Sequence, residues 1–117
     1  MALPAPEPER NWDDFKRQAA KRMVAASPQG SYMGRVPSIL FGIPIIEIEL
    51  HADGSVRAMN VKRLPSDPAA ANTVQYAMEA VRRAAPYADV SRLPKPWKWN
   101  EVFLFNESSQ FKPRTLD

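Results

Sequence analysis

The sequence contains no cysteine and a single histidine, which excludes disulfides, thiolate nucleophiles and metal sites built from several sulfur or imidazole ligands. His51 is followed by Asp53, but no second histidine completes a metal pair, so we expect an exposed surface residue. The four glycines form no phosphate loop, and no serine lies in a nucleophile-elbow pattern. The longest apolar run, residues 39 to 46, is far shorter than the roughly 20 residues that cross a bilayer. We therefore expect no enzymatic activity, no metal, no cofactor and no membrane span.

The composition is typical of one globular domain. With 117 residues, 44% of them hydrophobic and 25% charged, the chain is long enough for a single core. The net charge of +3 is weak support for a nucleic-acid partner. Many of the 12 prolines lie in residues 1 to 8 and 86 to 96. Residues 1 to 10 are therefore predicted to be a proline-rich linker remnant, and residues 11 to 117 the folded domain.

A first helix is predicted from Asn11, a good N-cap, to about Ala26. Its apolar residues recur at helical spacing: Trp12, Phe15, Ala19, Met23 and Ala26. The other face carries four bases, which we interpret as a solvated face rather than an anion-binding surface: Lys16, Arg17, Lys21 and Arg22. Residues 31 to 42 mix apolar residues with glycine and proline, and they are predicted to be a loop with short strand character.

A β-hairpin is predicted next. Residues 45 to 50 alternate apolar and acidic side chains, which is the period of a strand with one buried face. Asp53-Gly54 supplies a tight turn, and residues 56 to 63 return as a second strand. A two-residue turn pairs Leu50 with Arg57, whereas a three-residue turn pairs Leu50 with Val56. A bulge after Val56 would reconcile the two registers.

The acidic residues of the first strand have two interpretations. Glu47 and Glu49 are two positions apart on one strand face, where paired carboxylates can do acid–base work in a cleft. On the polar face of a hairpin they more simply keep that face solvated, opposite Arg57 or Lys62. We favour the second interpretation.

A second helix is predicted from the N-cap Asp67 and Pro68 to Ala85. Its apolar stripe is Val74, Ala77, Met78, Val81 and Ala85. After a proline-punctuated connector, residues 99 to 105 are rich in aromatic and β-branched residues and are predicted to be a third strand. No structure is assigned to residues 106 to 117.

These elements predict an α+β fold of two layers in the order α-β-β-α-β. A crossover through the second helix places the third strand beside the first, so the expected sheet is antiparallel, three-stranded and ordered 2-1-3. Both helices would cover one face of this sheet, and the third strand would be a free edge.

Several short motifs occur in an order that resembles the C-terminal periplasmic domains of TonB and TolA. The TonB-like motifs are Asp53-Gly54-Ser55-Val56, Ser66-Asp67-Pro68 and Ala84-Ala85-Pro86-Tyr87. The TolA-like motifs are Leu93-Pro94-Lys95-Pro96, Glu101-Val102-Phe103 and Phe111-Lys112-Pro113. The resemblance covers roughly residues 11 to 113. Residues 31 to 44 depart from it because they are longer and more apolar than expected.

This resemblance implies a receiver of inner-membrane energy that binds outer-membrane or periplasmic proteins. A motor complex in the inner membrane would act through a missing N-terminal anchor and spacer, and the domain would lie in the periplasm. Residues 1 to 4 lack the features of a secretory signal, so we expect either a cytosolic protein or a fragment trimmed from a longer one.

Strand addition is the binding mechanism that we expect, because an open edge offers unpaired main-chain groups to an extended segment. The predicted partner-binding residues are those of the third strand: Trp99, Asn100, Glu101, Val102, Phe103, Leu104 and Phe105. The same edge would permit a homodimer. The alternative is a single-stranded nucleic-acid binder that stacks bases on these aromatic rings. The low net charge argues against it, and we expect core packing for the rings and no nucleic-acid partner.

Overall fold

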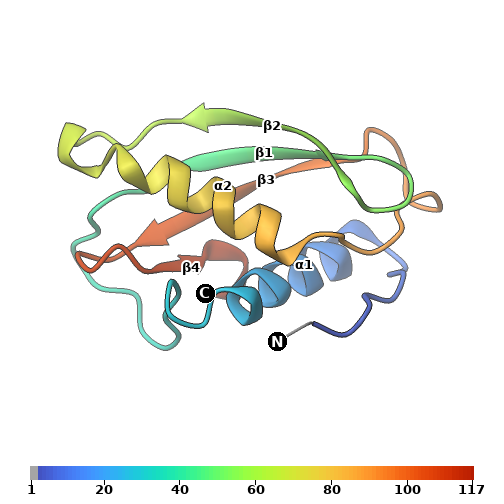
Figure 1. The fold of residues 1–117 in the computed structure, drawn as a ribbon, viewed down its shortest axis with the longest axis horizontal. Helices are drawn as coiled ribbons and strands as arrows, with labels where there is room; N and C mark the ends of the chain where they lie inside the picture. Colours follow the sequence, from blue (N-terminus) through green and yellow to red (C-terminus); the bar gives the residue numbers. More distant parts are fainter. Residues whose placement is uncertain (1–2) are drawn as a thin grey trace.

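The computed structural model describes residues 3–117, and its elements follow the predicted order with additions at the C-terminus. They are α1 (Trp12–Ala26), β1 (Ile45–Leu50), β2 (Val56–Arg63), the 3₁₀ turn η1 (Pro68–Ala70), α2 (Asn72–Ala84), β3 (Lys98–Phe105), β4 (Phe111–Pro113) and the 3₁₀ turn η2 (Arg114–Leu116). The strands form one antiparallel sheet in the order β2-β1-β3-β4 (Figure 1). The α+β class is confirmed. The predicted order 2-1-3 is extended by a fourth strand beyond β3.

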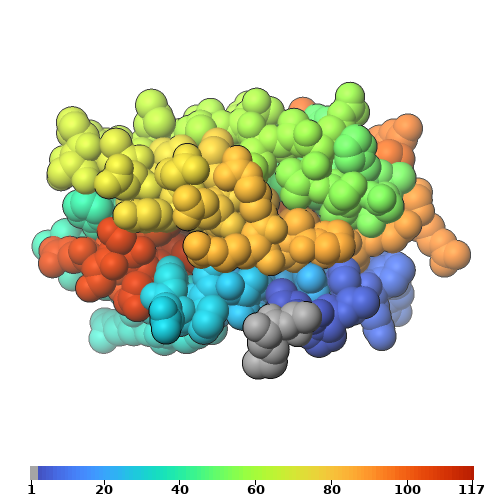
Figure 2. Space-filling view, in the orientation of Figure 1, coloured from blue at the N-terminus to red at the C-terminus, as the bar shows by residue number. Residues whose placement is uncertain are grey.

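Both helices contribute to a single core on one face of the sheet. The core joins Phe15 of α1 and Val81 of α2 to Ile48 of β1 and Phe103 of β3. Trp99 packs edge-on against Phe15, with ring centroids 5.0 Å apart. In Figures 1 and 2, α2 crosses in front of the sheet, with β2 along the upper margin and α1 below. The opposite face of β1 and β3 carries partly exposed or exposed polar residues such as Glu47 and Lys98.

Helix α1 begins as predicted. The side chain of Asn11 accepts a hydrogen bond from the Asp14 N–H at 2.8 Å, which satisfies one of the free donors at the helix start. Its buried face is Phe15, Ala19, Ala20 and Met23.

The interpretation of Arg22 as a solvated base is wrong. Its guanidinium donates to the carbonyl of Ala84 at 3.0 and 3.2 Å, because α2 ends beside α1. It also donates to the carbonyl of Pro4 at 2.7 Å, and Gln18 donates to the carbonyl of Glu7 at 3.0 Å. These contacts hold the proline-rich segment against α1.

The hairpin has the predicted register with the predicted bulge. Leu50 pairs with Val56 and Ile48 pairs with Met59, and the register shifts between Glu49 and Leu50. A second shift lies between Ile45 and Ile46 at the other end of the strand pair. Alternation along β1 is strict, since its even-numbered residues are buried and its odd-numbered residues are partly exposed.

Helix α2 is shorter than predicted. Asp67 caps the 3₁₀ turn η1 by accepting from the Ala69 N–H at 2.9 Å, and the α-helix starts only at Asn72. Its buried residues are Thr73, Ala77, Ala80, Val81 and Ala84. The predicted stripe is thus partly rotated, because Val74 and Met78 are only partly buried.

The segment between α1 and β1 has the short strand character that was expected. Ser31 forms a parallel bridge with Phe111, and Gly42 forms an antiparallel bridge with Phe105. No helix among residues 3–117 is long and apolar enough to cross a bilayer.

The hairpin turn is tied to the segment after α2, and this contact generates a stability prediction. The Tyr87 N–H donates to the Gly54 carbonyl at 2.9 Å, and Gly54 has a φ of 91°. A side chain at this position would overlap the carbonyl oxygen of Tyr87, whereas Gly34, with a φ of 88°, has open space around it. We expect Gly34→Ala to lower the free energy of unfolding by about 1 kcal/mol for the left-handed backbone. Gly54→Ala should lower it by at least about 3 kcal/mol. Urea unfolding compares the two variants, and equal losses would contradict the proposed overlap.

Candidate partner-binding edges

The seven residues predicted to bind a partner all lie on β3, but most of their side chains are buried. Trp99, Phe103 and Phe105 point into the core beneath the helices, which confirms the expectation of core packing. Their rings are therefore not available for base stacking. Leu104 is also buried, Asn100 is exposed and Val102 is partly exposed on the opposite face. Any partner of β3 would meet main-chain groups rather than these aromatic rings.

The prediction that the third strand is a free edge is wrong over its C-terminal half. Phe103, Leu104 and Phe105 pair with Pro113, Lys112 and Phe111 of β4. Strand β4 is fixed on its other side as well, since Phe111 donates to Gly30 at 3.0 Å and accepts from Tyr32 at 3.0 Å. The ring of Phe111 is buried against Phe103, with centroids 5.4 Å apart. Displacing β4 would break pairing on both sides and expose an aromatic ring.

The N-terminal half of β3 offers few free main-chain donors. Because Phe103 donates to Pro44 and Leu50 donates to Trp97, the odd-numbered residues of β3 direct their main chain toward β1. Of the outward donors, the Val102 N–H binds the Glu101 carboxylate at 3.1 Å and the Lys98 N–H binds the Pro96 carbonyl at 3.0 Å. Asn100 is left as the free donor of this half among the described residues. The predicted homodimer through the whole third strand is not available in this arrangement.

Strand β2 is the outermost strand on the other side of the sheet (Figure 1). Glu47 pairs with Asn60, and Glu49 pairs with Ala58, so these β2 residues direct their main chain toward β1. The alternation of a strand then directs the N–H and C=O groups of Met59 and Val61 away from the sheet. Within residues 3–117 these outward groups have no main-chain partner.

The polar face of the sheet carries ion pairs between neighbouring strands. Glu49 binds Arg57 of β2 at 3.2 Å, and Glu47 lies 3.8 Å from Lys62 and 3.7 Å from Lys98. These contacts confirm that the two glutamates face the bases of β2. Both carboxylates are engaged by these bases, so nothing in their placement favours acid–base catalysis.

Glu101 is an unusual feature of β3, because its carboxylate is buried with 1% of the residue exposed. The Thr115 hydroxyl of η2 donates to it at 3.1 Å, and so does the Val102 N–H. Burial raises the pKa of the Glu101 carboxyl to about 7, while these hydrogen bonds and the charge of Lys16 act in the opposite direction. The carboxyl therefore titrates near neutral pH and links β3 to the C-terminal turn.

The remaining polar candidates do not form a reactive cluster. His51 is exposed, as expected, and the Asp53 carboxylate accepts from the Ser55 hydroxyl at 2.6 Å. This hydrogen bond lowers the pKa of Asp53. In the part of the chain that the structure describes, no group of three histidine or acidic side chains is placed to hold a metal ion.

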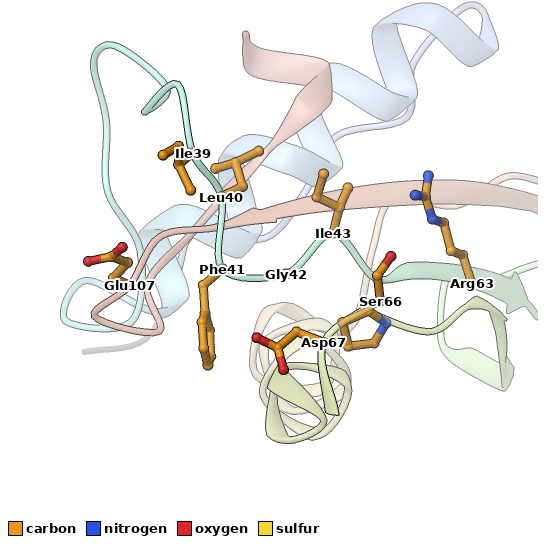
Figure 3. A pocket seen from close by; sticks show the side chains of 10 residues that line it. Ile39, Leu40, Phe41, Gly42, Ile43, Arg63, Ser66, Asp67 and Glu107 are labelled. Atoms are coloured by element: carbon orange, nitrogen blue, oxygen red, sulfur yellow. The ribbon is translucent and has the colours of Figure 1, made fainter. Parts of the chain in front are cut away.

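A pocket of about 300 Å³ lies where residues 39–43 pass the end of β2 (Figure 3). Arg63 and Glu107 lie at opposite ends of it, and the Asp67 carboxylate between them already caps η1. Exposed Ile39 and the partly exposed Phe41 make much of its wall apolar. The pocket is therefore lined by both apolar and charged side chains, and no ion pair joins Arg63 to Asp67 or Glu107 among the described residues.

Comparison of this chain with protein-family models, with curated proteins and with solved structures found no match.

Sequence reasoning did not predict the buried carboxylate of Glu101, and it placed the binding site on the third strand although the expected order 2-1-3 also leaves the second strand at an edge. Glu101 lies two positions from Trp99 and two from Phe103 and so shares their face of the strand, and a fold that buries those rings buries the carboxylate as well. Strand β2 carries three bases and no acid, which is typical of an edge strand. The sequence did not show which face of β3 is the core, or which edge of the sheet is covered by a further strand.

The raised pKa of Glu101 predicts how stability depends on pH. The folded protein holds the proton more tightly than the unfolded chain, whose glutamate has the ordinary pKa of 4.5. The contribution of Glu101 to the free energy of unfolding is therefore fully present below pH 4.5 and is lost as the pH rises through about 7. The difference between the pKa values of 4.5 and about 7 corresponds to a loss of roughly 3 kcal/mol in the free energy of unfolding. We expect Glu101→Gln to remove this dependence and to be more stable than the wild type at pH 8.

Urea unfolding at pH 5 and pH 8 measures this effect, with Glu107→Gln as an exposed control of the same chemistry. The control should follow the wild-type pH dependence. A Glu101→Gln variant that is less stable than the wild type at pH 8 would contradict the burial argument.

Proposed function

We propose that this chain is a non-catalytic protein-binding domain that takes an extended segment of a partner protein as an additional strand on the outer edge of β2. The observation that carries the proposal is the outward direction of the main-chain groups of Met59 and Val61, at the β2 end of the strand order, where neither a further strand nor an isolated bridge lies beside them within residues 3–117. The outward N–H and C=O groups of an edge strand have no partner in the sheet, so the edge can hydrogen-bond an extended chain that docks beside it.

The edge of β2 supports this function better than the predicted site on β3. Two consecutive outward residues of β2 offer both a donor and an acceptor, whereas Lys98 and Val102 of β3 have their donors engaged. Val61 is also 37% exposed, so a docked strand would find apolar surface beside its main chain.

The cellular setting that we propose comes from the resemblance to TonB and TolA. The order α-β-β-α-β and the position of β1 between β2 and β3 support it. In that setting the domain lies in the periplasm, is tethered to the inner membrane and its motor complex, and binds outer-membrane or periplasmic proteins. Immunoblots of periplasmic, membrane and cytosolic fractions test this setting, and a purely cytosolic protein would contradict it.

A proline on the β2 edge tests the binding mechanism. Val61→Pro removes the outward N–H and leaves the inward groups of Asn60 intact, which is the position where an edge strand tolerates proline. We expect linear peptides selected from a display library against the wild type to bind Val61→Pro at least tenfold more weakly. Fluorescence anisotropy measures the affinities.

Val61→Thr is the matched control, since it keeps the N–H and a β-branched side chain and should bind within threefold of the wild type. Met59→Pro repeats the test if Val61→Pro does not fold by circular dichroism. A library that enriches no peptide, or peptides that bind the proline variants as well as the wild type, would contradict the proposal.

A further inference from the structure

The side chains of β2 differ on its two faces, and this difference constrains what can dock beside it. On the polar face, Arg57 and Lys62 contact Glu49 and Glu47, and the bulged register pairs Arg63 with Ile45 on the same face, so β2 carries three bases there and no acid. On the helix side, Met59 and Val61 pair with Ile48 and Ile46 of β1. Leu64, which follows the strand, is 68% exposed. A neighbouring strand therefore meets bases on one face and apolar side chains on the other.

The inner neighbour of β2 already has the matching pattern. Strand β1 reads Ile-Ile-Glu-Ile-Glu-Leu, with Ile46 and Ile48 toward the core and its glutamates toward Arg57 and Lys62. Side chains of a sheet stand perpendicular to it, so those of β2 are reachable from both neighbouring positions. The outer edge presents the same side chains to a second strand.

The charge of the polar face is not balanced by β1. Four bases on β2 and β3, the three named above and Lys98, face only Glu47 and Glu49 on β1. Arg63 takes part in no ion pair among residues 3–117, and the Arg57 side chain is 64% exposed although it contacts Glu49. Acidic groups on the outer side would find these bases accessible.

From these observations, and resting on the proposed function, we infer that the partner segment is a short strand that alternates acidic and apolar residues. Its acidic side chains lie beside Arg57, Lys62 and Arg63, and its apolar side chains cover Met59 and Val61. The two register shifts of the β1–β2 pair confine regular geometry to the stretch from Ala58 to Val61, so the paired segment is about as short as β1.

A second copy of this chain is disfavoured on the same edge in the register centred on Asn60. Two β2 strands paired antiparallel about Asn60 would bring Arg57 of one copy opposite Arg63 of the other. Like charges directly opposite each other are destabilising, and natural edges use them to prevent self-association. The bases of β2 thus select against the chain itself and in favour of an acidic partner.

Two synthetic ten-residue peptides test the inference. One alternates valine with glutamate and the other alternates valine with lysine, each labelled with fluorescein and used at nanomolar concentration to keep it monomeric. We expect the glutamate peptide to bind the wild type at least tenfold more tightly than the lysine peptide in low salt. The difference should shrink in high salt, because exposed charges are screened.

Variants separate the edge from the rest of the surface. Arg63→Glu should weaken the binding of the glutamate peptide about threefold, as expected for one exposed ion pair. Val61→Pro should abolish the preference, whereas Lys21→Glu on the exposed face of α1 should leave it unchanged. If Val61→Pro binds the glutamate peptide as tightly as the wild type does, the peptide binds elsewhere on the surface and the inference is overturned.

The outcomes distinguish the inference from the proposed function. If library peptides require the Val61 N–H but the two charged peptides bind equally well, the inference of an acidic partner is overturned. The proposal of strand addition on β2 then still holds. A wild-type dimer in light scattering that Val61→Pro dissociates would identify a second copy as the occupant and overturn the inference. Failure of both the library and the charged peptides contradicts both.

Discussion

The pairing of β4 with the C-terminal half of β3 determines which side of the sheet keeps free main-chain groups. It holds because β4 is bonded on both sides, to Leu104 through Lys112 and to Gly30 and Tyr32 through Phe111. The Lys112 ammonium adds a hydrogen bond to the Gly34 carbonyl at 2.7 Å, and Thr115 binds the buried Glu101. These contacts fix the C-terminal segment in place. One side of the sheet is thereby closed over half its length, and the opposite margin at β2 is left open.

An open edge is a hazard as well as a binding site, and β2 carries both kinds of feature. Bulges at its two ends and the row of bases limit pairing with another copy, which is how soluble proteins avoid edge-to-edge aggregation. The same bases attract an acidic strand, so protection against self-association and selection of a partner arise from one set of side chains. Regular pairing geometry is confined to a few residues. Affinity would therefore depend on charge and on contacts with Met59 and Val61 as much as on main-chain hydrogen bonds.

Local patterns predicted most of the elements, whereas the edges depended on pairings between distant segments. Alternation identified β1, Asp53-Gly54 identified the hairpin, and Asn11 identified the start of α1. Strand β4 has only three residues and ends in proline, so its extended form follows from its position between β3 and Ser31 and not from its sequence. The role of Arg22 likewise depends on where α2 ends. The burial of Glu101 required knowing which face of β3 is the core, and alternation alone allows either face.

Amide hydrogen exchange measured residue by residue on the free protein tests most directly whether β2, and not β3, is the open edge. The account predicts rapid exchange for the outward amides of Met59 and Val61, and strong protection for Asn60, which faces β1, and Leu104, which faces β4. Protection at Met59 and Val61 combined with rapid exchange at Leu104 would mean that β3 is the open edge, and would contradict it.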